Sequence, residues 1–319
     1  MWVLMICKEI TMKHDSKKFN IEYKAILDSF NTNNDVRIWV VQPSTSIYQK
    51  IENFSVSHKP KKSYRDRQEN KISYFEFKSQ KNITIQVNIQ ATLWKNKINL
   101  KKEDVSLPRI STKLFKQYTK SEKFLEQTPE IKKLTHQITK KDKFVLDKIQ
   151  SIFNFIVENF KYCHPVKQRG VKYLNLNNLR GDCGEYSSLF VTMCRILKIP
   201  ARNNTGFVLF TKQKKIVEHG WASVYLKPYS WIDIDTQYAS LEKNVNIGAK
   251  KYFAQRNDYR MTFVNGFNIS LKPAIPQNFQ LNYWNKLGLP LTYNSVQTLQ
   301  PIVFASKEKV RFKDNIKII

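Results

Sequence analysis

The sequence predicts an α+β fold, in which a β-rich N-terminal module precedes a region of helices and antiparallel strands. Between residues 19 and 100, apolar side chains repeatedly alternate with polar ones, which is the period of a half-buried strand. From residue 131 onward, apolar side chains recur mostly at steps of three and four, as in amphipathic helices. Two apolar stretches within 219–235, separated by a short break, then indicate a pair of adjacent antiparallel strands.

Four stretches of the N-terminal region are predicted to be strands. They cover residues 19–25, 36–41, 75–77 and 83–89. The polar stretch 57–71 is predicted to be a loop. These elements indicate a small antiparallel module over residues 1–105 that packs against the rest of the chain, and none of its residues suggests chemistry.

The middle of the chain, residues 106–270, is predicted to be a separate core. Helical patches begin within 131–138, and a longer amphipathic helix is expected over 144–160. A second helix is expected from Cys183 to the proline at 200, because Asp182 and Glu185 have the spacing of an acidic capping box. Residues 271–319 contain four prolines and are predicted to form an irregular extension packed on this core.

The net charge of +28 comes from 54 basic and 26 acidic residues, and it is evenly distributed along the chain. Residues 1–150 carry 30 basic and 16 acidic side chains, and residues 151–319 carry 24 and 10. Lysine dominates over arginine, the residue that proteins prefer for bidentate phosphate recognition. The charge therefore favours a solvated lysine-rich surface over a specific nucleic-acid or other polyanion site.

The four cysteines, Cys7, Cys163, Cys183 and Cys194, match no zinc-binding spacing, and the sequence predicts no metal or cofactor. A disulfide framework is not expected at this chain length, so a reducing compartment is predicted. The first twelve residues lack the features of a secretory signal, and no apolar run reaches the roughly 18 residues of a membrane span. We therefore expect a cytoplasmic location.

One segment, residues 179–202, carries the features of a reactive cysteine. Cys183 falls on the first turn of the predicted helix, where unpaired backbone N–H groups favour a thiolate. The neighbouring acids Asp182 and Glu185 oppose the thiolate, so a nearby imidazolium would be needed. His219 begins the first predicted strand of the 219–235 pair, and the second strand ends in acidic residues. This order fits a thiolate, an imidazole and an orienting carboxylate.

These residues resemble the transglutaminase-like superfamily of papain-like cysteine enzymes. The matching motifs occur in the family's order and spacing: Gly181, Cys183, Gly184 and Tyr186; Ile199, Pro200, Ala201 and Arg202; His219 and Trp221; Trp231 and Asp235. The resemblance covers about residues 145–240, and it implies a papain-like core whose nucleophile helix packs on an antiparallel sheet. The chain departs from the family pattern at Ala222, where an acidic residue is common, and at Thr236, where a proline is common.

The resemblance implies that Cys183 is the nucleophile, His219 the general base and acid, and Asp235 the orienting carboxylate. Asp233 is a rival for the last role, because strand alternation places it on the same face. Trp221 and Tyr162 are candidate substrate contacts. The backbone N–H of Cys183 would stabilise the oxyanion, and Tyr162 is also a candidate for the second donor.

The expected function is acyl transfer at an amide, in a peptide or a glutamine side chain, through a thioester on Cys183. The acceptor is either water or a lysine amine, and hydrolysis is slightly favoured. The expected partner is therefore a protein or peptide substrate. Two alternatives stay open, namely a non-catalytic binding module on the same fold and a polyanion-binding protein.

Overall fold

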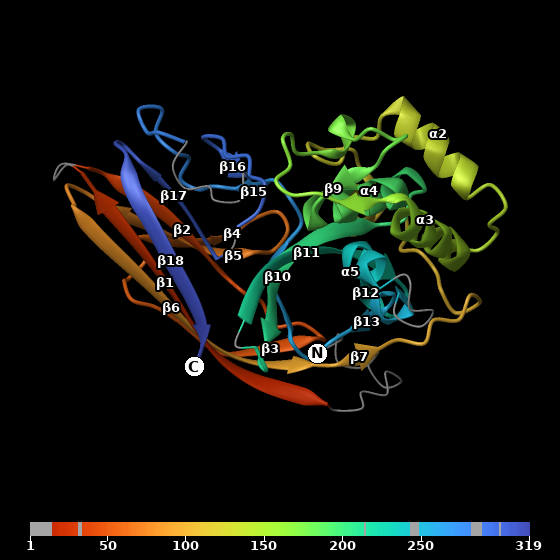
Figure 1. Cartoon of the computed structure of the whole chain (residues 1–319), viewed down its shortest axis with the longest axis horizontal. Coiled ribbons are helices and arrows are strands. Elements are labelled where there is room, and N and C mark those ends of the chain that lie inside the picture. Colours follow the sequence, from red (N-terminus) through yellow and green to blue (C-terminus); the bar gives the residue numbers. More distant parts are fainter. Residues whose placement is uncertain (1–14, 31–33, 214, 243–248, 282–288, 300) are drawn as a thin grey trace. The chain divides into compact units, whose positions relative to one another are not determined.

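The structure is a computed structural model that describes residues 15–30, 34–213, 215–242, 249–281, 289–299 and 301–319 (Figure 1). The contacts divide the chain into two compact units. The first, here called the helix unit, contains residues 95–204 and 220–257, and the second, the β unit, contains 15–94, 205–219 and 258–319. Cys7 and the N-terminal residues 1–12 lie outside the described part of the chain. The mixed class and antiparallel sheets predicted from the sequence are confirmed.

The first sheet of the β unit has the strand order β18-β1-β6-β3. Its strands are β1 (Ser16–Ser29), β3 (Gln49–Val56), β6 (Asn82–Trp94) and β18 (Val310–Ile318). Alternate residues of β1 are buried, as the sequence pattern predicted, and the strand pairs with β6 on one side and β18 on the other (Figure 1).

The second sheet of the β unit has the order β17-β2-β5-β4. Its strands are β2 (Val36–Gln42), β4 (Lys62–Arg65), β5 (Lys71–Phe77) and β17 (Ile302–Ser306). The buried side chains of both sheets form one hydrophobic cluster, which includes the fully buried Trp39. Shorter strands complete this unit: β14 (Arg260–Asn265), β15 (Ile269–Ser270) and β16 (Ser295–Val296).

Two predictions about this region are wrong. The predicted loop 57–71 contains β4, which pairs antiparallel with β5. The predicted irregular extension contains β17 and β18, which pair with β2 and β1. These strands gain their hydrogen bonds from partners distant in sequence, so local composition did not reveal them. The three-part division into 1–105, 106–270 and 271–319 stays a prediction, because the compact units are built from interleaved segments.

The helix unit contains five helices in its described part. These are α1 (Lys113–Thr119), α2 (Pro129–Ile138), α3 (Val145–Asn159), α4 (Cys183–Ile196) and α5 (Thr236–Leu241), with the 3₁₀ turns η2 (Val171–Tyr173) and η3 (Ala249–Tyr252). Helices α2, α3 and α4 match the helical segments predicted from the sequence, whereas α1 and α5 were not predicted. The buried face of α3 carries Ile149, Ile152, Phe153 and Ile156. Helix α3 contacts both α4, which begins at Cys183, and α5.

Strands β12 (Ser230–Ile234), β11 (Lys215–Leu226), β10 (Ala201–Phe210) and β14 form one sheet in that order. The antiparallel pair that was predicted over 219–235 is confirmed, and Ala222 lies opposite Ile234. Within the helix unit, short pairings also join β8 (Lys161–Tyr162) to β9 (Arg180–Gly181) and β13 (Gln255–Arg256) to β7 (Asn96–Lys97). Among the described residues, no helix combines the length and the apolar character needed to span a membrane.

Candidate active site

Cys183 is the first residue of α4, as predicted, and its side chain is half-buried. Asp182 caps this helix, because its Oδ1 accepts the backbone N–H of Gly184 at 2.8 Å. The Glu185 carboxylate in turn accepts the backbone N–H of Asp182. This reciprocal arrangement is the acidic capping box that the sequence predicted, and it fixes where the helix begins.

Arg169 is a residue of this site that sequence reasoning missed. Its Nη1 donates to Asp182 Oδ1 and to Glu185 Oε2, both at 2.7 Å, and the residue is 8% exposed. His164 Nδ1 lies 3.3 Å from the other Asp182 oxygen. Arg169 reaches the helix from a loop 13 and 16 residues away in sequence, so no local spacing signalled its role.

The two carboxylates of the capping box are electrostatically different. Burial alone would raise the pKa of Asp182, but the hydrogen bond and charge of Arg169 lower that pKa to about 2. Burial and the adjacent Asp182 charge raise the pKa of Glu185 to about 8. At neutral pH the site therefore holds one fixed negative charge at Asp182, a mostly protonated Glu185 and the positive charge of Arg169.

The backbone of Gly220 contacts the sulfur of Cys183. The Gly220 N–H donates a hydrogen bond to this sulfur, and a Cβ atom built on Gly220 would lie 3.9 Å from Sγ. His219 is the residue directly before Gly220 in β11, and it is 3% exposed. The chain therefore brings the backbone next to the predicted base into direct contact with the predicted nucleophile.

The surroundings of Cys183 disfavour a thiolate. Burial and the Asp182 charge raise the pKa of the Cys183 thiol to about 12, and the charges of Asp235 and Glu185 act in the same direction. The hydrogen bond from Gly220 lowers this pKa, but it does not compensate. The thiolate expected from helix position is therefore not favoured by these neighbours, and a positive partner or a general base is required.

Asp235 lies directly after β12, where it is buried and caps α5 through a 3.0 Å hydrogen bond from the Tyr238 N–H to Oδ1. Its charge reaches the sulfur of Cys183, since it contributes to the raised pKa of that thiol. The strand pairing ends with Ala222 opposite Ile234, so Trp221 and Asp235 directly adjoin the last residue pair of the two strands. By strand alternation, His219 projects to the same face as Trp221.

Asp233, the rival carboxylate, has two other partners. Its Oδ1 accepts from Ser223 Oγ at 2.7 Å, and its Oδ2 accepts from Arg256 Nη1 at 2.9 Å. Asn204 Nδ2 donates to the same Ser223 hydroxyl, so Asp233 belongs to a buried polar network. Both of its oxygens serve the packing of the sheet, which favours Asp235 for the catalytic role.

The two candidate substrate contacts differ in exposure. Tyr162 is 53% exposed, and its pKa is raised by burial and by the charges of Cys183 and Asp182, so it lies within electrostatic range of Cys183. Trp221 is 0% exposed, and the guanidinium of Arg256 lies over its ring at 5.5 Å. Trp221 therefore offers no surface to a substrate in this structure, whereas Tyr162 does.

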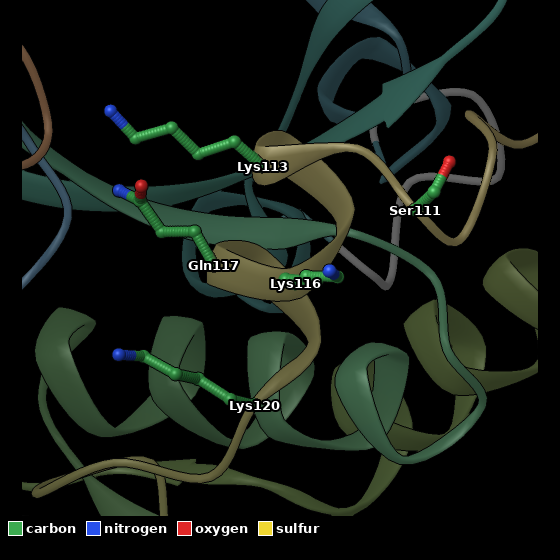
Figure 2. Close-up of a pocket in the computed structure, with 5 residues that line it drawn as sticks. All are labelled: Ser111, Lys113, Lys116, Gln117 and Lys120. Carbon is green, nitrogen blue, oxygen red and sulfur yellow. The ribbon is translucent and has the colours of Figure 1, made fainter.

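A separate pocket of about 460 Å³ lies on α1, and none of the predicted catalytic residues lines it. Its lining residues are Ser111, Lys113, Lys116, Gln117 and Lys120 (Figure 2). In Figure 2, the side chains of Lys113, Gln117 and Lys120 extend to one side of the helix, and Ser111 lies on the other. Within the described residues, no group of three or more His, Cys, Asp or Glu side chains is arranged to hold a metal ion.

Comparison with known families confirms the resemblance found in the sequence. Residues 132–236 match the model of the transglutaminase-like superfamily, and this segment contains Cys183, His219 and Asp235. No curated protein sequence matches the chain significantly.

One solved structure is similar to this chain over nearly its whole length, and a second is similar over part of it. A structure named as a putative cysteine protease from Cytophaga hutchinsonii aligns with a TM-score of 0.61 at 13% identity, over 95% of this chain and 91% of that one. The periplasmic domain of TgpA from Pseudomonas aeruginosa aligns with a TM-score of 0.38 at 12% identity, over 71% of this chain and 77% of that one. At this identity, the first of these similarities establishes the fold.

Proposed function

We propose that this transglutaminase-like chain is a cysteine-dependent enzyme that cleaves an amide of a protein or peptide through a thioester on Cys183. His219 is the proposed general base and acid, and Asp235 is the proposed orienting carboxylate. The observation that carries the proposal is the hydrogen bond from the Gly220 N–H to the Cys183 sulfur. Through this hydrogen bond, the backbone next to His219 contacts the Cys183 sulfur. The charge of Asp235 also acts on this sulfur, because it raises the pKa of the thiol.

In the first half of the reaction, the His219 imidazole takes the proton of the Cys183 thiol as the sulfur attacks the carbonyl carbon. The C–S bond forms, and the carbonyl oxygen becomes an oxyanion. The C–N bond then breaks, and the imidazolium gives its proton to the leaving amine. Because the neighbours of Cys183 raise its thiol pKa, deprotonation by His219 is the step that this site must supply.

In the second half, an acceptor releases the acyl group from the sulfur. Water gives hydrolysis, and a lysine amine gives a new amide, with His219 removing the acceptor proton in both cases. We favour hydrolysis, because the Cys183 side chain and Tyr162 are partly exposed, which leaves the thioester accessible to water.

The oxyanion requires hydrogen-bond donors near the attacked carbonyl. The backbone N–H of Cys183, at the N-terminus of α4, is one proposed donor. The phenol of Tyr162 is the proposed second donor, because it is exposed and close enough to Cys183 for the two groups to interact electrostatically.

The test is turnover of a fluorogenic peptide library by the full chain, with and without a fluorescent primary amine. We expect peptide cleavage that disappears in Cys183→Ala and persists in Cys163→Ala, the matched control at a neighbouring cysteine. Incorporation of the amine in place of hydrolysis would instead establish the transferase. Turnover that survives Cys183→Ala would refute the proposal, and peptide binding without turnover in the wild type would support the non-catalytic alternative.

A reducing location fits this chemistry, because the nucleophile must stay a free thiol. Cys163, Cys183 and Cys194 are all free. The cytoplasmic location stays a prediction, and cell fractionation with an epitope-tagged full-length chain would test it.

A further inference from the structure

A buried arginine braces the first turn of the nucleophile helix, although it belongs to a loop outside that helix. Arg169 Nη1 bridges Asp182 Oδ1 and Glu185 Oε2 at 2.7 Å each. Burying a guanidinium beside two carboxylates carries a large desolvation penalty, so such clusters are weak evidence for stability alone. A cluster of this kind beside Cys183 points to an effect on the cysteine itself.

The two acidic side chains stabilise the start of the helix but disfavour the thiolate of Cys183. Asp182 caps the helix that presents Cys183, and Glu185 completes the capping box. After the larger effect of burial, the charge of Asp182 raises the pKa of the Cys183 thiol, and Glu185 adds to this effect in its ionised form. A helix start with this cap needs a compensating positive charge if its cysteine is to react as a thiolate.

Arg169 lies within electrostatic reach of the sulfur. Although burial lowers it, the pKa of Arg169 is raised by the hydrogen bond to Asp182, by the charges of Glu185 and Asp182, and by the thiolate form of Cys183. A negative charge on the Cys183 sulfur therefore favours the protonated guanidinium across the first turn of α4.

Two glycines leave room for this cluster. A Cβ atom on Gly184 would lie 3.4 Å from Arg169 Nη1 and 3.1 Å from Asp182 Oδ1. A Cβ atom on Gly181 would lie 2.5 Å from Glu185 Cβ, closer than real Cβ contacts allow. The glycines that flank Asp182 and Cys183 thus permit the close approach of the arginine and the two acids.

We propose that Arg169 is a positioning residue for Cys183, which holds the Asp182 cap in place and offsets the negative charge that the cap brings to the sulfur. The proposal rests on the proposed function, in which Cys183 is the nucleophile. It adds a residue from outside the three predicted catalytic positions. Two further titratable side chains lie near the cap: His164, whose Nδ1 is 3.3 Å from Asp182 Oδ2, and Tyr162, which interacts with the Asp182 charge.

The experiment measures the rate at which iodoacetamide alkylates Cys183 in the full chain at pH 8, followed by mass spectrometry. We expect Arg169→Gln to slow alkylation about tenfold, which corresponds to a rise of about one unit in the thiol pKa. Arg169→Lys keeps the charge and should stay within about threefold of wild type. Asp182→Asn keeps a good helix cap without its charge and should speed alkylation about tenfold.

Arg195→Gln is the matched control for a merely structural effect. Arg195 is a buried arginine of the same helix, 1% exposed, and its Nη1 pairs with Glu122 Oε1 at 2.7 Å. Its loss should lower the free energy of unfolding and leave Cys183 alkylation within about twofold of wild type. The alkylation assay needs no substrate, so an absence of peptide turnover would contradict the proposed function and leave this comparison intact.

The proposal is overturned if Arg169→Gln alkylates at the wild-type rate, or if Arg195→Gln is slowed as much as Arg169→Gln. If Arg169→Gln does not fold, the alkylation rate of Cys183 in Asp182→Asn tests the proposal instead. A wild-type rate in Asp182→Asn would show that the charge of the cap does not act on the sulfur, and the role of Arg169 would then be structural.

Discussion

Asp233 and Asp235 are two residues apart, yet their carboxylates have different partners and therefore different expected roles. Asp233 gives one oxygen to Ser223 and the other to Arg256, and all three side chains are buried. Asp235 gives Oδ1 to the backbone N–H of Tyr238, and its charge reaches Cys183. The motif spacing favoured Asp235 from the sequence, and these contacts give a physical reason for the same choice.

Asp235→Asn is expected to lower turnover by roughly 10²- to 10⁴-fold, because an amide neither orients the His219 ring nor stabilises its protonated form as a carboxylate does. Asparagine still caps a helix well, so α5 should remain intact. Steady-state kinetics on a cleaved peptide, with circular dichroism for folding, make the measurement.

Asp233→Asn is the matched comparison and breaks the ion pair with Arg256. It should lower the free energy of unfolding by roughly 1–3 kcal/mol and change turnover by less than tenfold. A larger loss of turnover in Asp233→Asn than in Asp235→Asn would reverse the assignment of the orienting carboxylate.

The reactivity of Cys183 is expected to depend on His219. Since burial and nearby carboxylates hold the pKa of the Cys183 thiol near 12, any rapid alkylation near neutral pH requires the imidazole. In His219→Ala, alkylation of Cys183 at pH 7 should slow at least tenfold, whereas Cys163 should be unaffected. Cys194 is fully buried and should label in neither protein. Equal alkylation rates for Cys183 in the wild type and in His219→Ala would show that His219 does not activate the Cys183 thiol.

At the residue scale, the sequence predicted the contacts between residues that lie close together in the chain. The capping box joins Asp182 to Glu185, three positions later in the chain, and the structure contains it. Arg169 was not predicted, because its contacts depend on how the loop before β9 folds back onto α4. For Trp221 the sequence left two roles open, packing in the core or lining a substrate cleft, and the structure buries the side chain completely.

At the element scale, the first turn of α4 should make stability depend on pH. The folded-state pKa of Glu185 is raised to about 8, above its usual value, so the folded protein retains a proton that the unfolded chain has lost. Its contribution is therefore present at low pH and is lost as the pH rises from about 4.5 through about 8. The slope can reach about 1.4 kcal/mol per pH unit for one proton.

Glu185→Gln removes this titration and retains an oxygen that can accept the Asp182 N–H. Between pH 5 and pH 9, we expect the free energy of unfolding to fall less in Glu185→Gln than in the wild type, as measured by urea denaturation at each pH. Parallel curves for the two proteins would mean that Glu185 is ionised across this range.

The same scale shows why some elements were predicted and others were not. Helix α3 and strands β1 and β6 are long and periodic, so their sequences identified them. Strand β18 also has alternating burial, with Val310, Phe312 and Ile316 on the inner side, but charged neighbours and the preceding prolines obscured the pattern. Strand β4 has four residues, none of them buried, so its pairing with β5 decides its conformation.

At the scale of the whole molecule, the excess positive charge is shared equally by the two halves of the sequence. The α1 pocket is one local example of this positive surface, because its lining includes the exposed side chains of Lys113, Lys116 and Lys120 (Figure 2). Such a surface attracts any polyanion at low ionic strength and loses it as salt displaces the contacts. This general attraction must be distinguished from a dedicated binding site.

Raising the salt concentration should separate the enzyme from the polyanion-binding alternative. We expect binding of a 20-nucleotide single strand, measured by fluorescence anisotropy, to weaken more than 100-fold between 50 and 300 mM salt, because it rests on exposed lysines. Cleavage of an uncharged peptide should change less than threefold over the same range, because the proposed chemistry is carried by buried or half-buried groups at Cys183, His219 and Asp235. Oligonucleotide binding that stays tight at 300 mM salt, together with an absence of turnover, would instead favour a polyanion-binding protein built on this fold.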